Sequence, residues 1–82
     1  MENAVLIDGV FSVPDALELL NAMYMQKIRF HESKIHHSDS EEDIKFREEK
    51  IKHMQAQLHH LRTHLKDSSM VQLHAEIAVS PL

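Results

Sequence analysis

The chain has 82 residues, a length that predicts a single small domain spanning residues 1–82. It contains no cysteine, which excludes a disulfide framework and a thiolate zinc site, and its net charge of −4 argues against a general nucleic-acid binder. A domain of this size without disulfides has a small core, and association between subunits is a common way to enlarge it.

The first ten residues, MENAVLIDGV, lack the basic start and the long apolar stretch of a secretory signal peptide. No part of the chain is apolar over the roughly 20 residues that cross a bilayer as a helix. We therefore expect a cytoplasmic protein that does not enter the membrane.

The N-terminal segment contains an apolar run at about 4–7. Asp8-Gly9 follows it, and this dipeptide is typical of turns. The pattern indicates a short strand at 4–7 that ends in a turn, and an irregular segment is the alternative.

The stretch SVPD, at 12–15, has the features of a helix start. Ser12 can cap the helix, Pro14 suits its first turn, and Asp15 completes a capping box. No helix breaker follows before about residue 36, so we expect the first helix at about 13–36.

The polar stretch HHSDSEED predicts a loop at about 37–40 and then a second helix at about 41–66. Ser40 can cap this helix, with Asp43 three residues further on. After it the hydrophobic period changes to two, which predicts a strand at about 70–79 that ends before Pro81. The predicted fold class is mainly α: an antiparallel two-helix hairpin with a C-terminal strand, which pairs with the N-terminal strand if that strand forms.

The second helix has one row of apolar residues at alternating spacings of three and four. This row is typical of a helix that packs along one partner helix. It consists of Ile44, Ile51, Met54, Leu58, Leu61 and Leu65. Since two long helices joined by a short loop pack antiparallel, the row is expected to face the first helix.

The first helix has two apolar rows instead of one. At about 100° per residue, one row holds Leu17, Leu20, Tyr24, Ile28 and Ile35, and a separate row holds Leu19, Met23 and Phe30. A hairpin covers only one row, so we expect a homodimer or homotetramer in which a second subunit covers the other. The predicted interface consists of Leu19, Met23 and Phe30 of the first helix and Phe46 of the second. In the alternative, the strands of the same chain cover the second row.

Histidines gather on the second helix beside the apolar row. His53, His60 and His64 share one face, and His60 and His64 are spaced i,i+4, so two imidazoles could bind one divalent metal such as zinc. Antiparallel packing suggests Glu18 as the third ligand. In the alternative, these histidines bind no metal and form a partly exposed polar flank or part of a subunit interface. Protonation at low pH would then place like charges close together on one helix face, which is unfavourable. His31 is expected to be structural, with a hydrogen bond to Glu48.

No nucleophile motif, phosphate loop or pair of catalytic carboxylates is present in the sequence, so no catalytic or cofactor-binding residue is assigned. The expected function is that of a non-enzymatic, self-associating helical hairpin that binds another protein as an interaction or adaptor module. A histidine-based metal-binding or pH-responsive protein is the first alternative. A small enzyme with its active site between subunits is the second.

Overall fold

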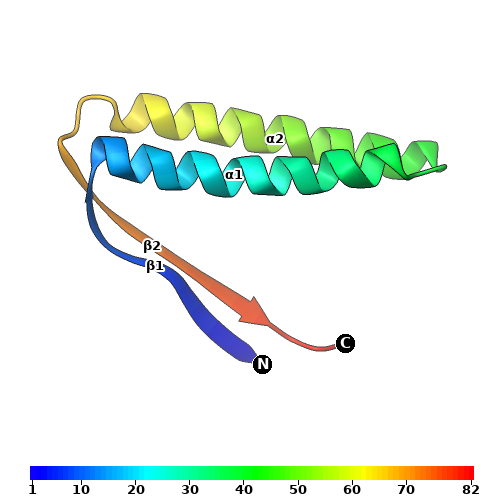
Figure 1. The fold of residues 1–82 in the computed structure, drawn as a ribbon, viewed down its shortest axis with the longest axis horizontal. Coiled ribbons are helices and arrows are strands. Elements are labelled where there is room, and N and C mark those ends of the chain that lie inside the picture. The colour runs from blue at the N-terminus through cyan, green and yellow to red at the C-terminus, as the bar shows by residue number, and fades with distance from the viewer.

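The computed structural model describes all 82 residues and consists of a helical hairpin and a two-stranded sheet (Figure 1). The elements are β1 (Glu2–Ser12), α1 (Val13–His36), α2 (Glu41–Leu65) and β2 (Met70–Val79). The two helices and the antiparallel pair of strands agree with the predicted fold class. Neither helix combines the length and the apolar character that a membrane crossing requires.

Both helices begin at the serines that the sequence marks as caps. The Ser12 hydroxyl accepts a hydrogen bond from the Asp15 amide at 3.3 Å, and the Ser40 hydroxyl accepts one from the Asp43 amide at 3.2 Å. Each cap satisfies one of the amides that lack a partner within the helix, and so it defines where the helix starts.

The core of the chain is very small. Only five residues are buried: Val13, Ala16, Ile28, Met54 and Leu58. The last three lie in the apolar rows with which α1 and α2 face one another. The other residues of the α2 row, at 44, 51, 61 and 65, are half-buried, so this row does pack against α1.

β1 and β2 pair antiparallel along nearly their whole length. Ile7 pairs with Ala75, Gly9 with Leu73, and an irregularity in β1 lies between Val5 and Ile7. The prediction of a turn at Asp8-Gly9 is therefore wrong, and β1 is longer than the predicted segment at 4–7. The chain needs no reversal there, because the helical hairpin itself brings β2 back beside β1, and β2 supplies a hydrogen-bonding partner along β1.

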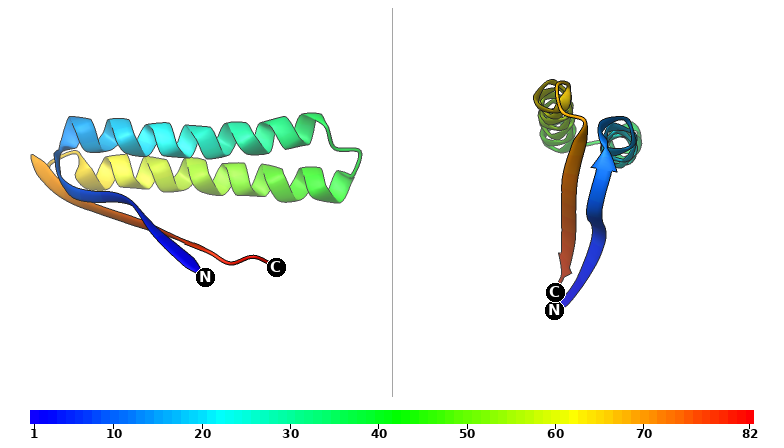
Figure 2. Two further views of the ribbon diagram at one scale, coloured as in Figure 1. Left: turned by 60° about the horizontal axis from the view of Figure 1, so that its bottom comes forward. Right: turned by 90° about the vertical axis from the view of Figure 1, so that its left-hand side faces the viewer.

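The sheet leaves the helices at an angle instead of lying along them (Figures 1 and 2). The two layers meet where β1 enters α1, and the Val13 amide there donates to the Ser69 carbonyl at 3.0 Å. Both chain termini lie together at the far end of the sheet (Figure 2). The molecule is accordingly long and thin, with extents of 46 × 32 × 14 Å.

Candidate interaction surface

The sheet has one markedly apolar face, which we call the inner face. Pairing and alternation place its members on one side of the sheet. They are Ile7, Phe11, Val71, Leu73, Ala75 and Ile77. The members nearer the junction are half-buried, whereas the intervening residues of both strands are exposed, so this face is turned toward α1. Toward the free end it becomes uncovered, and Ile77 is 40% exposed.

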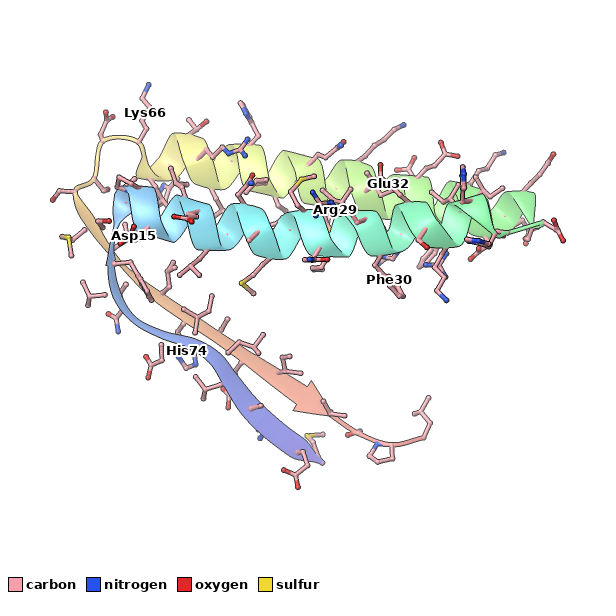
Figure 3. The ribbon with its side chains drawn as sticks, viewed as in Figure 1. Asp15, Arg29, Phe30, Glu32, Lys66 and His74 are labelled. Atoms are coloured by element: carbon pink, nitrogen blue, oxygen red, sulfur yellow. The ribbon has the colours of Figure 1, made fainter.

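A second apolar surface runs along α1 and consists of Leu19, Met23 and Phe30. Phe30 is 56% exposed and projects from α1 on the side of the sheet (Figure 3). The strands of the same chain cover this row only in part: Phe11 of β1 lines a groove with Leu19, whereas the sheet diverges from α1 and leaves Phe30 exposed. The predicted interface residues Leu19 and Phe30 are thus accessible, and Met23 is half-buried.

Phe46, the interface residue predicted on α2, is also uncovered, with 57% of its surface exposed. The Lys50 ammonium lies 5.3 Å from its ring centroid, as the Lys34 ammonium lies 5.6 Å from that of Phe30. Such contacts are attractive but contribute little at exposed sites, so they leave both rings available to a partner.

The two apolar surfaces meet in a groove at the junction of sheet and helix. It has a volume of about 360 Å³ and is lined by five residues. These are Phe11, Asp15, Glu18, Leu19 and Ala22. The groove has an apolar floor with two carboxylates beside it, and it joins the inner face of the sheet to the apolar row of α1.

Polar side chains connect the helices on both sides of the core. The Arg62 guanidinium donates to the Asn21 side-chain oxygen, and the Tyr24 hydroxyl donates to the Gln57 side-chain oxygen at 3.4 Å. These cross-links lie within about one helical turn of each other on α1, so they fix the register of α1 against α2 in the part of the hairpin nearer the sheet.

The most developed polar cluster is built around Arg47. Its Nε donates to Asp43 at 3.2 Å, and its Nη1 lies 3.1 Å from Nδ1 of His31. The predicted hydrogen bond from His31 to Glu48 is therefore wrong, because the Arg47 guanidinium reaches the imidazole from the same stretch of α2. Burial and the nearby Arg47 charge lower the pKa of His31 below its usual value of 6.5. A hydrogen bond from the Ser38 side chain and the Arg47 charge lower the pKa of Asp43.

The structure does not assemble the predicted metal ligands into one site. His60 and His64 stack with ring centroids 6.3 Å apart and an angle of 9° between their planes. Glu18 lies in the groove beside Phe11 instead, and no group of three potential ligands in the chain is placed to hold a metal ion. His60 and His64 are exposed, as is His53 on the same face.

The outer face of the sheet carries a charged cluster around His74 (Figure 3). Its Nδ1 lies 3.8 Å from Asp8, the residue opposite it on β1, and its Nε2 lies 3.7 Å from Glu76. All three side chains are at least half exposed, so their mutual attraction adds little to stability.

Comparison of the chain with family models, curated proteins and solved structures finds no match. The functional proposals below depend on the surfaces of the chain alone. Phe11 on the inner face was not predicted from the sequence, because a turn at Asp8-Gly9 would end the strand at residue 7. The period of two that joins Ile7, Gly9 and Phe11 across this dipeptide was the signal that could have revealed it.

Proposed function

We propose that this protein is a non-enzymatic, self-associating helical-hairpin module that acts by binding another protein. The observation that carries the proposal is apolar surface left open on two different elements. Phe30 and Leu19 on α1 and Ile77 on β2 are each more than a third exposed. A soluble monomer rarely exposes connected apolar surface of this kind without a partner to cover it.

The total surface of the chain supports the same proposal. The chain exposes 6584 Å², whereas a compact monomer of its mass exposes about 5000 Å². The excess of about 1500 Å² exceeds the roughly 800 Å² that each partner buries in a standard interface. One chain therefore has enough surplus surface for a stable interface with another copy and for a further contact.

Histidine-based metal binding and catalysis at a subunit interface are less favoured candidates. The stacked pair of His60 and His64 supplies only two ligands, whereas zinc sites in proteins have three or four protein ligands. The groove is lined by two carboxylates and three apolar residues, and no histidine, serine or lysine lines it beside Asp15 and Glu18. We place the proposed module in the cytoplasm, as a homodimer or homotetramer.

Sedimentation equilibrium of the purified protein at micromolar concentration tests the proposal. We expect a mass at least twice the 9.5 kDa of one chain, because one chain alone leaves its apolar surfaces in water. A single species of 9.5 kDa over the whole concentration range would contradict self-association.

A further inference from the structure

We propose that two copies of this chain pair edge to edge along β2, antiparallel and centred on Ala75. The two strands of each chain then form one four-stranded sheet in the order β1-β2-β2-β1, with a two-fold axis at its centre. This inference rests on the proposed self-association and specifies the surface that carries it. A two-stranded sheet alone is marginal in water, whereas a larger sheet with one apolar face can be stable.

The outer edge of β2 has backbone groups without a partner. In an antiparallel pair, every second residue of a strand turns its N–H and C=O groups away from the neighbouring strand. β1 occupies one edge of β2, and the other edge is open where the sheet projects from the helices (Figure 2). Apart from the bonds to β1, no hydrogen bond of the chain involves residues 70–79. A further strand would satisfy the groups on this edge.

The two edges of the sheet are not equally suited to pairing. β2 is regular over ten residues and contains no Pro, Gly or Lys. β1 is interrupted by the irregularity between Val5 and Ile7, and it contains Asp8 and Gly9, which are residue types depleted in strands. Bulges and charged residues are features by which proteins keep an edge strand from pairing. We therefore expect the second copy at β2, with the β1 edges as the two ends of the sheet.

The inner face of β2 is complementary to itself when the strand is reversed about Ala75. This register places Leu73 opposite Ile77 and Val71 opposite Val79, so apolar residues meet apolar residues. Ile77 and Val79 are 40% and 55% exposed in one chain, at the free end of the sheet. In the pair, that free end lies beside the better covered end of the other copy. The apolar inner face of one sheet thus continues into that of the other.

The outer face selects the same register and stays in water. Reversal about Ala75 places His74 of each copy opposite Glu76 of the other. An imidazole N–H can donate to a carboxylate, so both cross-strand pairs are favourable. A centre one residue away would place Glu76 opposite Glu76 or His74 opposite His74. Because the arrangement uses the same edge on both chains, it closes at two copies.

Disulfide formation between two different single-cysteine variants tests the register. The chain has no cysteine, and Gln72→Cys and Ala78→Cys each introduce one at an exposed position of the outer face. In the proposed pair, residue 72 of one copy lies opposite residue 78 of the other. Opposite residues of antiparallel strands have Cα atoms about 4.5–5.5 Å apart, a separation that a disulfide can span. We expect a disulfide-linked dimer when the two variants are refolded together and oxidised.

Each variant alone is the matched control. In a dimer of a single variant, the two thiols are roughly 20 Å apart along the strands, which is too far for a disulfide. Neither Gln72→Cys nor Ala78→Cys should therefore form a linked dimer by itself. Both positions are exposed, so a failure to link cannot be attributed to an inaccessible thiol.

Lysine substitutions provide an independent measurement of affinity. Glu76 and Asp8 lie 3.7 Å and 3.8 Å from His74, both side chains are at least half exposed, and lysine changes the charge equally at each. Only Glu76 faces the second copy. Glu76→Lys should raise the dissociation constant roughly tenfold, because two cross-strand pairs are lost in each dimer. Asp8→Lys should leave the constant unchanged. Circular dichroism confirms that both variants keep their helices.

The outcomes separate this inference from the proposed function. A wild-type protein that sediments as a monomer overturns both. An oligomeric wild type whose mixed variants form no linked dimer overturns pairing through β2 and leaves self-association intact. Linkage of either variant alone to the same extent as the mixture also overturns the pairing, as do equal dissociation constants for Glu76→Lys and Asp8→Lys.

Discussion

At the scale of single residues, the contact between His31 and Arg47 decides the protonation state of an imidazole. A guanidinium can only donate hydrogen bonds, so Nδ1 of His31, which lies 3.1 Å from Arg47 Nη1, must be the acceptor. The proton of the neutral ring then resides on Nε2. Protonation of Nδ1 would remove this acceptor and place a second cation beside Arg47. Burial of the ring and, after it, the nearby Arg47 charge therefore lower the pKa of His31.

Acidification should therefore destabilise the hairpin through His31. Because its folded pKa lies below its unfolded value of about 6.5, the folded state binds fewer protons than the unfolded state. The stabilising contribution is present above that unfolded pKa and is lost as pH falls through the folded pKa. We expect a loss of roughly 1 kcal/mol, the usual net contribution of a hydrogen bond, between about pH 7.5 and 5.5.

Chemical denaturation at those two pH values measures the effect. His31→Gln should show a smaller difference between the two pH values than wild type, because glutamine keeps an acceptor and does not titrate. His59→Gln is the matched control, since His59 is an exposed histidine of α2. If His31→Gln and wild type lose the same stability on acidification, this histidine is not the pH-sensitive group.

At the scale of elements, both helices begin at a capping serine, whereas the strands pair mainly with each other and have few other contacts. A two-stranded sheet alone is marginal in water, and here it has no helix packed along it. The inner face is uncovered toward the free end, where Ile77 is 40% exposed and Val79 is 55% exposed. We therefore expect a partner to stabilise the sheet more than it stabilises either helix.

The cap of α2 is a local feature whose contribution can be measured separately. The Ser40 hydroxyl accepts from the Asp43 amide, and Ser40→Ala would leave that amide without its partner. We expect a loss of about 0.5–2 kcal/mol in the free energy of unfolding, measured by urea denaturation. Ser69→Ala in the other connection is the control, because Ser69 contributes its backbone carbonyl rather than a cap. Equal losses in the two variants would contradict a specific capping role.

At the scale of the whole molecule, five buried residues out of 82 form too small a core for a stable independent domain. Apolar side chains at the free end of the inner face and on α1, such as Ile77 and Phe30, stay in water in one chain, and the proposed self-association would cover them. Folding and association should therefore be coupled, as they are in dimers that have no stable folded monomer.

Coupled folding predicts a melting temperature that depends on protein concentration. A roughly hundredfold increase in concentration should raise Tm by several degrees, because mass action favours the associated state. Differential scanning calorimetry at two concentrations measures this, with repeated scan rates to establish that unfolding is at equilibrium. The same Tm at both concentrations would indicate that one chain is stable alone.

The sequence by itself determined the features that depend on neighbouring residues in the chain. The capping serines at 12 and 40, the apolar row around Met54 and Leu58, and the alternation of β2 all arise from local hydrogen bonding or from a regular period. Each of these patterns predicts one element regardless of what packs on it. The two apolar rows of α1, of which only one has a matching row on α2, were visible for the same reason.

Only the tertiary structure decided how those elements meet. Asp8-Gly9 is extended because β2 lies beside it, although the same dipeptide forms turns elsewhere. His31 bonds to Arg47 and not to Glu48, since helix register and side-chain reach select the partner. Glu18 lies in the groove by Phe11, away from a site shared with His60 and His64, because the direction of a side chain depends on helix rotation. The angle between sheet and helices likewise leaves Phe30 and Ile77 uncovered, and no local pattern in the chain encodes that angle.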